Sequence, residues 1–148
     1  MLSWQCARLD ELDAPTLYAV LRLRAEVFVV EQRCVYLDPD GKDLDAWHLL
    51  GRAEDGSLLA YARLLEAEEG PKIGRVVTAA AARGAGQGRA LMLEALATCE
   101  RLWPGRAVGL QAQAYLQDFY TSLGFAPVSQ VYEEDGIPHI DMRQEDGP

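Results

Sequence analysis

Arg83-Gly84-Ala85-Gly86-Gln87-Gly88 is the most informative segment of the chain. It follows an apolar run at 73–78 and leads directly into a helix-like segment from Arg89 onward. Glycines at these steps let the backbone turn sharply and leave bare amide groups at the start of the helix. Because first-turn amides lack an intrahelical partner and the helix dipole adds positive charge, such a turn binds anions. We therefore expect a ligand that carries phosphate.

The order of residues in this segment excludes two common phosphate-binding loops. A dinucleotide fingerprint needs a glycine where Arg89 stands, and a P-loop needs Lys followed by Ser or Thr after its last glycine. The plain alternative is a glycine-rich connection that binds nothing. Three glycines in five residues cost conformational entropy on folding, so a plain connector has little reason to carry them.

The distribution of charge supports a local phosphate ligand. The formal net charge is −9 and the sequence pI is about 4.6, which argues against nucleic acid as a partner because its backbone is bound by Lys and Arg. Acidic residues gather at 38–45, 66–69 and 133–135; most of them read as solvated loops, but they would also attract a cationic amine. The segment 71–93, in contrast, has no acidic residue and carries four basic ones, Lys72, Arg75, Arg83 and Arg89.

Length and composition indicate one globular domain over residues 1–148, with 49% hydrophobic residues. No apolar run approaches the ~18 residues of a membrane span, and the start of the chain lacks a basic signal-peptide region. The three cysteines, Cys6, Cys34 and Cys99, have no metal-ligand spacing. We expect free thiols, a cytoplasmic protein, no metal and no membrane partner.

The periodicity of the chain predicts alternating strands and helices. The order of elements is βα, ββ, βαβα and ββ, which is typical of an α/β (α+β) arrangement around a mixed sheet. Asp13 is the expected N-cap of the first helix, which ends at 29–32, and Asp55-Gly56 is a hairpin turn. The expected strands are 2–9, 47–53, 58–65, 73–78, 108–112, 127–132 and 138–143, the later helices 89–101 and 116–123, and the connections an acidic loop at 66–70 and an alanine lead at 79–82.

A second signature lies at 113–125, where Phe119-Tyr120 is followed by a short spacer and Gly124-Phe125. Together with the Arg-x-x-Gly-x-Gly loop, in this order and separated by a helix and a strand, it resembles the GNAT N-acetyltransferase superfamily. The blocks at 24–32, 40–43 and 134–140 resemble the ElaA-like branch of that superfamily, so that the likeness covers nearly the whole chain. The resemblance implies a mostly antiparallel sheet of about six to seven strands, flanked by helices and splayed into a cofactor cleft between its central strands.

The resemblance also implies a set of ligand contacts for acetyl-CoA as the acyl donor. Gln113 stands where many members carry Asn beside the cofactor's arm, and Tyr120 matches the tyrosine that serves as general acid to the departing thiolate. The strand residues Val76, Val77 and Thr78 match the backbone that pairs with the pantetheine arm. The pyrophosphate would be bound mainly by backbone amides of Arg83, Gly84, Ala85, Gly86, Gln87, Gly88 and Arg89.

The residues alone leave the general base open. Glu26, Glu31, His48 and His139 are candidates, of which Glu31 and His139 rank first, and a water-relayed proton with no single base is equally credible. Phe119 is expected to be a better core residue than its neighbour Tyr120. A structural role for Tyr120 remains the alternative to catalysis.

The implied reaction is direct acetyl transfer to a primary amine of a small molecule or peptide, without an acyl-enzyme. Two other functions are compatible with the sequence. One is an acyltransferase like the acyl-homoserine-lactone synthases, whose N-terminal Arg-x-Glu-Val-Phe block is similar to the one here. The other is a CoA-binding sensor or scaffold without turnover. A homodimer is compatible with the superfamily.

Overall fold

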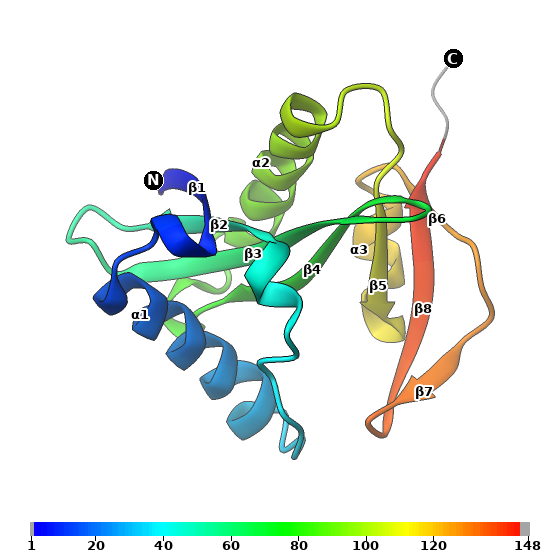
Figure 1. Cartoon of the computed structure of the whole chain (residues 1–148). Helices are drawn as coiled ribbons and strands as arrows, with labels where there is room; N and C mark the ends of the chain where they lie inside the picture. Colours follow the sequence, from blue (N-terminus) through cyan, green and yellow to red (C-terminus); the bar gives the residue numbers. More distant parts are fainter. Residues whose placement is uncertain (1, 146–148) are drawn as a thin grey trace.

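One eight-stranded sheet organises the chain in a computed structural model that describes residues 2–145. The strands follow the order β1-β2-β3-β4-β5-β8-β6, with β7 paired to the other end of β8 (Figure 1). All neighbours are antiparallel except β4 and β5, which are parallel. The bounds are β1 Ser3–Arg8, β2 Trp47–Arg52, β3 Leu58–Ala67, β4 Gly70–Thr78, β5 Gly109–Gln113, β6 Phe125–Pro127, β7 Tyr132–Glu134 and β8 Ile137–Gln144.

Three α-helices flank the sheet: α1 Ala14–Arg24, α2 Gln87–Leu102 and α3 Gln117–Thr121. The Asp13 carboxylate caps α1 as predicted, accepting a 2.8 Å hydrogen bond from the Thr16 amide. Beyond α1 the chain continues through wider π-helical turns, Ala25–Glu31. Short 3-10 helices occupy Leu9–Glu11, Lys42–Asp45, Ala80–Ala82 and Ala114–Leu116.

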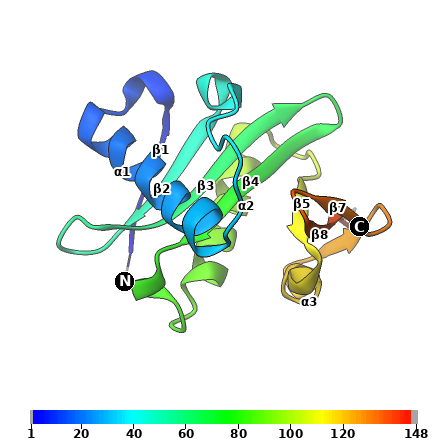
Figure 2. The same ribbon diagram turned by 90° about the horizontal axis from the view of Figure 1, so that it is seen from below.

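The two faces of the sheet bury separate cores. On one face α2 packs on β3 and β4, and its Leu91, Met92 and Ala95 are fully buried. On the other face α1 brings Val20 and Leu23 against β2, β3 and β4. Helices therefore cover both faces of the β1–β4 half, as the alternating element order predicts (Figures 1 and 2).

The structure corrects four sequence expectations. The prediction of an acidic loop at 66–70 is wrong, because β3 and β4 continue as paired strands up to a tight turn at Glu68-Glu69. The strand expected at 127–132 is wrong as well: residues 128–131 belong to no strand and separate β6 from β7, which brings the sheet to eight strands. The alanine lead contains a 3-10 helix, and α2 begins at Gln87, two residues before the expected start at Arg89.

The sheet splays apart between β4 and β5. The two strands pair only at Lys72↔Gly109 and Ile73↔Leu110, and beyond Ile73 they separate. The pairing of β3 with β4 also shifts by one residue at this point, and Arg75 takes a left-handed backbone conformation with φ of 49°. The expected opening between the central strands is thereby confirmed, and it leaves the β4 backbone at Val76–Thr78 without a partner on the β5 side (Figure 2).

Candidate active site

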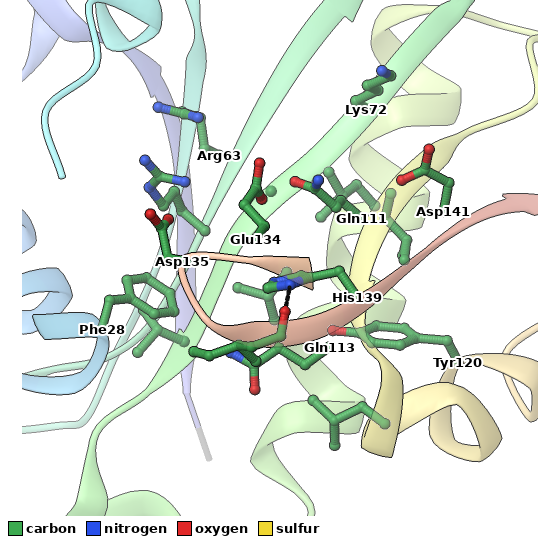
Figure 3. Close-up of a pocket in the computed structure, with 18 of the residues that line it drawn as sticks. Phe28, Arg63, Lys72, Gln111, Gln113, Tyr120, Glu134, Asp135, His139 and Asp141 are labelled. Atoms are coloured by element: carbon green, nitrogen blue, oxygen red, sulfur yellow. Dashed lines mark hydrogen bonds between the residues drawn. The ribbon is translucent and has the colours of Figure 1, made fainter. Parts of the chain in front are cut away.

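A cleft of about 820 Å³ occupies the opening between β4 and β5. Residues of β4 line one wall, and residues of β5, β7 and β8 line the other (Figure 3). The π-helical turns at Ala25–Glu31 contribute Phe28 and Glu31 to the lining. The thiol of Cys34 lies 3.7 Å from the carbonyl oxygen of Asp135, so that one corner of the cleft is bridged.

The glycine loop, at which we expect an anion to bind and which we call the anion seat, begins at Arg83 on the edge of this cleft. Gly84 and Gly86 have φ of 86° and 75°, a left-handed conformation that side chains other than glycine rarely adopt. Gly86 is the N-cap of α2, and its carbonyl accepts from Ala90, which leaves the amides of Gln87, Gly88 and Arg89 without intrahelical partners. A Cβ at any of the three loop glycines would meet nothing within 4 Å. The residues present therefore fit a pyrophosphate.

The side chains of Arg83 and Arg89, at the two ends of the predicted pyrophosphate site, make hydrogen bonds to other parts of the chain. The Arg83 guanidinium lies 2.7 Å from the Glu31 carboxylate and donates to the Thr78 carbonyl oxygen at 3.2 Å. Arg89 donates to the Ser122 hydroxyl at 3.2 Å. Arg83 and Glu31 line the same cleft, which brings the base candidate Glu31 to the anion seat.

Tyr120 is buried, with 6% of its surface exposed, and still borders the cleft. Its ring packs edge-to-face on Phe119 and Phe125, and its hydroxyl makes no hydrogen bond to the residues that the structure describes. The expectation that Phe119 is the better core residue is wrong, because Phe119 is only partly buried. Burial raises the pKa of Tyr120 to about 12, so the hydroxyl keeps its proton at neutral pH.

His139 lies on β8 opposite Gln113 of β5, and both line the cleft. Its Nδ1 is 2.7 Å from the carbonyl oxygen of Ile137 (Figure 3). Because a carbonyl can only accept, Nδ1 donates to it, and in the neutral imidazole the lone pair is then on Nε2. The ring stacks on Tyr132 at 6.2 Å between centroids, which fixes its orientation.

The other two base candidates lie outside the cleft. Glu26 is exposed and pairs with Arg22 at 2.8 Å. His48 is buried, and both of its ring nitrogens are taken, Nδ1 by the Tyr61 hydroxyl at 2.6 Å and Nε2 by the Asp43 carbonyl at 3.0 Å. Glu31 and His139 are thus the two candidates that the fold brings to the cleft.

Comparison with known proteins matches residues 42–145 to the model of the acetyltransferase (GNAT) domain. The chain is also 51% identical to the protein ElaA of Escherichia coli K12, over 98% of this chain and 97% of that one. The chain belongs to the GNAT acetyltransferase family. It is therefore an acyltransferase, as the glycine loop and the 113–125 segment predicted.

Solved structures extend the likeness of this GNAT chain. The crystal structure of Escherichia coli ElaA superimposes with a TM-score of 0.91, covering 98% of this chain and all of that one at 51% identity. An acyl-CoA N-acyltransferase from Pseudomonas aeruginosa reaches 0.92 at 50% identity, with the same coverage. The acyl-homoserine-lactone synthase LasI reaches 0.77 over 97% of this chain and 89% of that one, but at 17% identity it shows a shared fold alone.

The sequence reading missed a buried ionic network that supports one wall of the GNAT cleft. The aspartates at 38–45 were expected to be mostly solvated, but Asp38 and Asp43 are buried. Arg24, fully buried, lies 2.7 Å from Asp38 and 2.8 Å from Asp43. The network comprises Arg24, Arg63, Arg75, Asp38, Asp40 and Asp43. Its signal in the sequence is Arg63, a charge in the middle of the apolar strand at 58–65.

The network fixes its own charge states. Burial on its own raises the pKa of Asp40, but hydrogen bonds from Arg63 and the Lys42 amide, with the charges of Arg63 and Arg75, outweigh it and lower the pKa to about 2. Burial likewise opposes the charge on Arg24, and its pKa is nevertheless raised by Asp43, Tyr61 and Asp38. These ion pairs tie the 38–43 loop to β3 and to the bulge at Arg75.

No group of three or more His, Cys, Asp or Glu side chains suited to a metal ion occurs in residues 2–145. Within the same range, no helix is long and apolar enough to cross a bilayer.

Proposed function

We propose that this enzyme transfers an acetyl group from acetyl-CoA directly to a primary amine. The observation that carries the proposal is that the cleft, which contains both Tyr120 and His139, reaches Thr78 and Arg83, where the anion seat begins. A phosphate-bearing donor seated there places its other end between β4 and β5, along the backbone of Val76, Val77 and Thr78. Both the 42–145 family match and the acyl-CoA N-acyltransferase neighbour support acyl-CoA as the donor.

The chain's own groups divide the work of binding and proton transfer. Free amides of Gln87, Gly88 and Arg89 would hold the pyrophosphate, and the β4 backbone would orient the pantetheine arm. Bound acetyl-CoA supplies an activated thioester carbonyl, and its thiolate is a tolerable leaving group. The amine must lose a proton before it attacks, because amines are mostly protonated near neutral pH.

His139 is the base that we favour for this proton. Its Nε2 is free while Nδ1–H is held by Ile137, so the ring presents a lone pair on the cleft side of β8. Glu31 is less suited, since its carboxylate is already paired with Arg83 at the anion seat. Tyr120 keeps its proton at neutral pH, and its hydroxyl has no hydrogen-bond partner among residues 2–145. The hydroxyl is therefore suited to donate its proton to the departing sulfur.

Binding and turnover test the proposal separately. Calorimetric titration with acetyl-CoA, CoA and NAD should show saturable binding of the two CoA species alone. Gly86→Asp should abolish that binding, because it adds a side chain and a negative charge at the seat. An amine panel assayed by thiol release should then reveal turnover. Absence of CoA binding by the wild-type protein would refute the donor assignment.

Variants of the two proton-transfer residues test their roles. Tyr120→Phe and His139→Gln should each lower kcat about a hundredfold or more, with little change in the affinity for acetyl-CoA. Turnover that survives Tyr120→Phe would reduce Tyr120 to a packing residue. Turnover that survives His139→Gln would favour a water-relayed proton.

We also infer a cytoplasmic location. Cys6, Cys34 and Cys99 are all free thiols, which suits a reducing compartment. Thiol alkylation of the protein in freshly lysed cells should label all three after denaturation.

A further inference from the structure

A cluster of polar side chains lies along the β5–β8–β7 wall of the cleft, next to His139. Gln111 faces Asp141 across the β5–β8 ladder, and Tyr132 faces His139 across the β7–β8 ladder. Residues two apart on a strand share a face, so Asp141 lies on the same side of β8 as His139, and Glu134 on the same side of β7 as Tyr132. All of these residues line the cleft, and Figure 3 shows Gln111, Glu134, His139 and Asp141 of this group.

The hydrogen bonds of this cluster leave mostly acceptors free, with the second N–H of the Gln111 amide as the remaining donor. The Tyr132 hydroxyl lies 2.5 Å from Asp141 Oδ1, and because a carboxylate can only accept, the tyrosine proton is directed to Asp141. The Tyr132 oxygen in turn accepts from the Gln111 amide nitrogen, also at 2.5 Å. Gln111 Oε1 and the second oxygen of Asp141 therefore remain available, together with the Glu134 carboxylate.

The acidic side chains of this wall also lack basic partners. Glu134, Asp135 and Asp141 have no Lys or Arg nitrogen within 4.0 Å in the described part of the chain. The basic residues of the cleft are mostly occupied elsewhere: Arg63, Arg75, Lys72 and Arg83 each pair with a carboxylate, and Arg143 donates to the Glu69 carbonyl oxygen. Lys42 belongs to the loop at the opposite wall.

Tyr120 supplies a second indication that a ligand enters the cleft. Its side chain is more than nine-tenths buried, and its hydroxyl, which has no hydrogen-bond partner among residues 2–145, points into the cleft beside His139 (Figure 3). Because this hydroxyl opens onto the cleft and has no protein partner, its hydrogen bond is available to a molecule that occupies the cleft.

We propose that Gln111, Asp141 and Glu134 bind a second ammonium group of the acceptor, and that the acceptor is a short diamine. An ammonium has three N–H donors and no acceptor, which complements a cluster that offers acceptors and unpaired negative charge. Asp141 and His139 are two residues apart on β8, about 7 Å along the strand. A four- or five-carbon diamine therefore reaches from the Asp141 subsite to His139 Nε2, where its other amine loses the proton.

This inference rests on the proposed amine acetylation, and its test separates the two. With acetyl-CoA as donor, kcat/KM is measured for diaminobutane and for butylamine, which lacks the second amine. The wild-type enzyme should prefer diaminobutane about tenfold to a hundredfold, the value of one charge-assisted hydrogen bond. Asp141→Asn should bring this ratio close to one.

Two further variants complete the test. Glu134→Gln, at an exposed position where a folding defect is not expected, should also lower the ratio. The matched control is Glu54→Gln, an exposed acidic residue outside the cleft, which should leave the ratio unchanged. A wild-type ratio near one, or a preference that survives both Asp141→Asn and Glu134→Gln, would overturn the diamine subsite while leaving the acetyltransferase proposal intact.

A binding measurement covers the case in which no amine is acetylated. Diaminobutane is titrated calorimetrically into the CoA-saturated protein, and into the Asp141→Asn and Glu134→Gln variants. Binding that the two variants weaken at least tenfold supports the subsite even though the proposed reaction fails. Binding that is absent, or unaffected by both variants, overturns the subsite.

Discussion

Gly88→Ala should make the protein more stable and a poorer binder of CoA. Gly88 lies in the first turn of α2 with an ordinary helical backbone, and a Cβ there would meet nothing within 4 Å. Alanine is favoured over glycine in a helix by about 0.5–1 kcal/mol, so the free energy of unfolding should rise by that amount. For a chain of this size the increase corresponds to about 1–4 °C in Tm.

The loss in binding follows from the same open space. If the pyrophosphate lies against the bare amides, the new methyl group occupies the side from which it approaches. The loss of one charge-assisted hydrogen bond costs about 1.5–3 kcal/mol, which is about tenfold to a hundredfold in the Kd for CoA. Chemical denaturation of the free protein gives the stability, and calorimetric titration gives the Kd.

Gly84→Ala is the matched control for Gly88→Ala. Its surroundings are equally open, but its φ of 86° is unfavourable for alanine, so this variant should lose about 1–2 kcal/mol of stability. A Gly88→Ala protein that binds CoA as tightly as the wild type would refute the seat at the first turn of α2. A Gly88→Ala protein that loses stability would refute the open space around this residue.

Three further predictions concern charged groups. Arg24→Met should destabilise the fold by about 3–5 kcal/mol in urea denaturation, because it breaks two buried ion pairs and leaves Asp38 with Arg75 alone and Asp43 with Arg63 alone. The exposed Arg22→Met, two residues away, should cost under about 1 kcal/mol, and equal effects would refute the network. Glu31→Gln should lower the Kd for CoA about two- to fivefold, because it frees the Arg83 guanidinium from its ion pair. A collapse of turnover in this variant would instead identify Glu31 as the base. Burial lowers the pKa of His48 below 6.5, so the unfolded state binds the extra proton and stability should fall as the pH drops from 6.5; a flat profile between pH 7.5 and 5.5 would contradict this.

The features that the sequence predicted correctly are those with local causes. The Asp13 cap, the glycine loop and the start of a helix after it depend on residues a few positions apart, whose backbone preferences act wherever the chain lies. The opening between β4 and β5 came instead from the family resemblance, because the separation of two strands depends on their partners. The exact ends of elements were less certain, as the early start of α2 shows.

Features that join distant residues could not be predicted in the same way. Arg24 meets Asp38 and Asp43 only because α1 and the 38–43 loop pack on the same side of the sheet. A run of aspartates beside proline and glycine is typical of a solvated turn, and nothing local distinguishes a buried one. The Tyr132–Asp141 bond likewise requires the turn at Asp135-Gly136 to fold β7 onto β8, and the strand expected at 127–132 placed Tyr132 at the end of a longer strand.

Because β4 and β5 pair over a short stretch, the packing of the protein interior determines the width of the cleft. Two ladder positions cannot by themselves set the angle between the halves of the sheet. The angle is held instead by the shared core beneath, where Leu64 and Leu91 pack in one cluster with Phe125 and Met142, none of which lines the cleft. Repacking these apolar residues would open or narrow the cleft without altering a single lining side chain. Mutations of core residues can thus change the choice of substrate even though none of the mutated residues lies in the cleft.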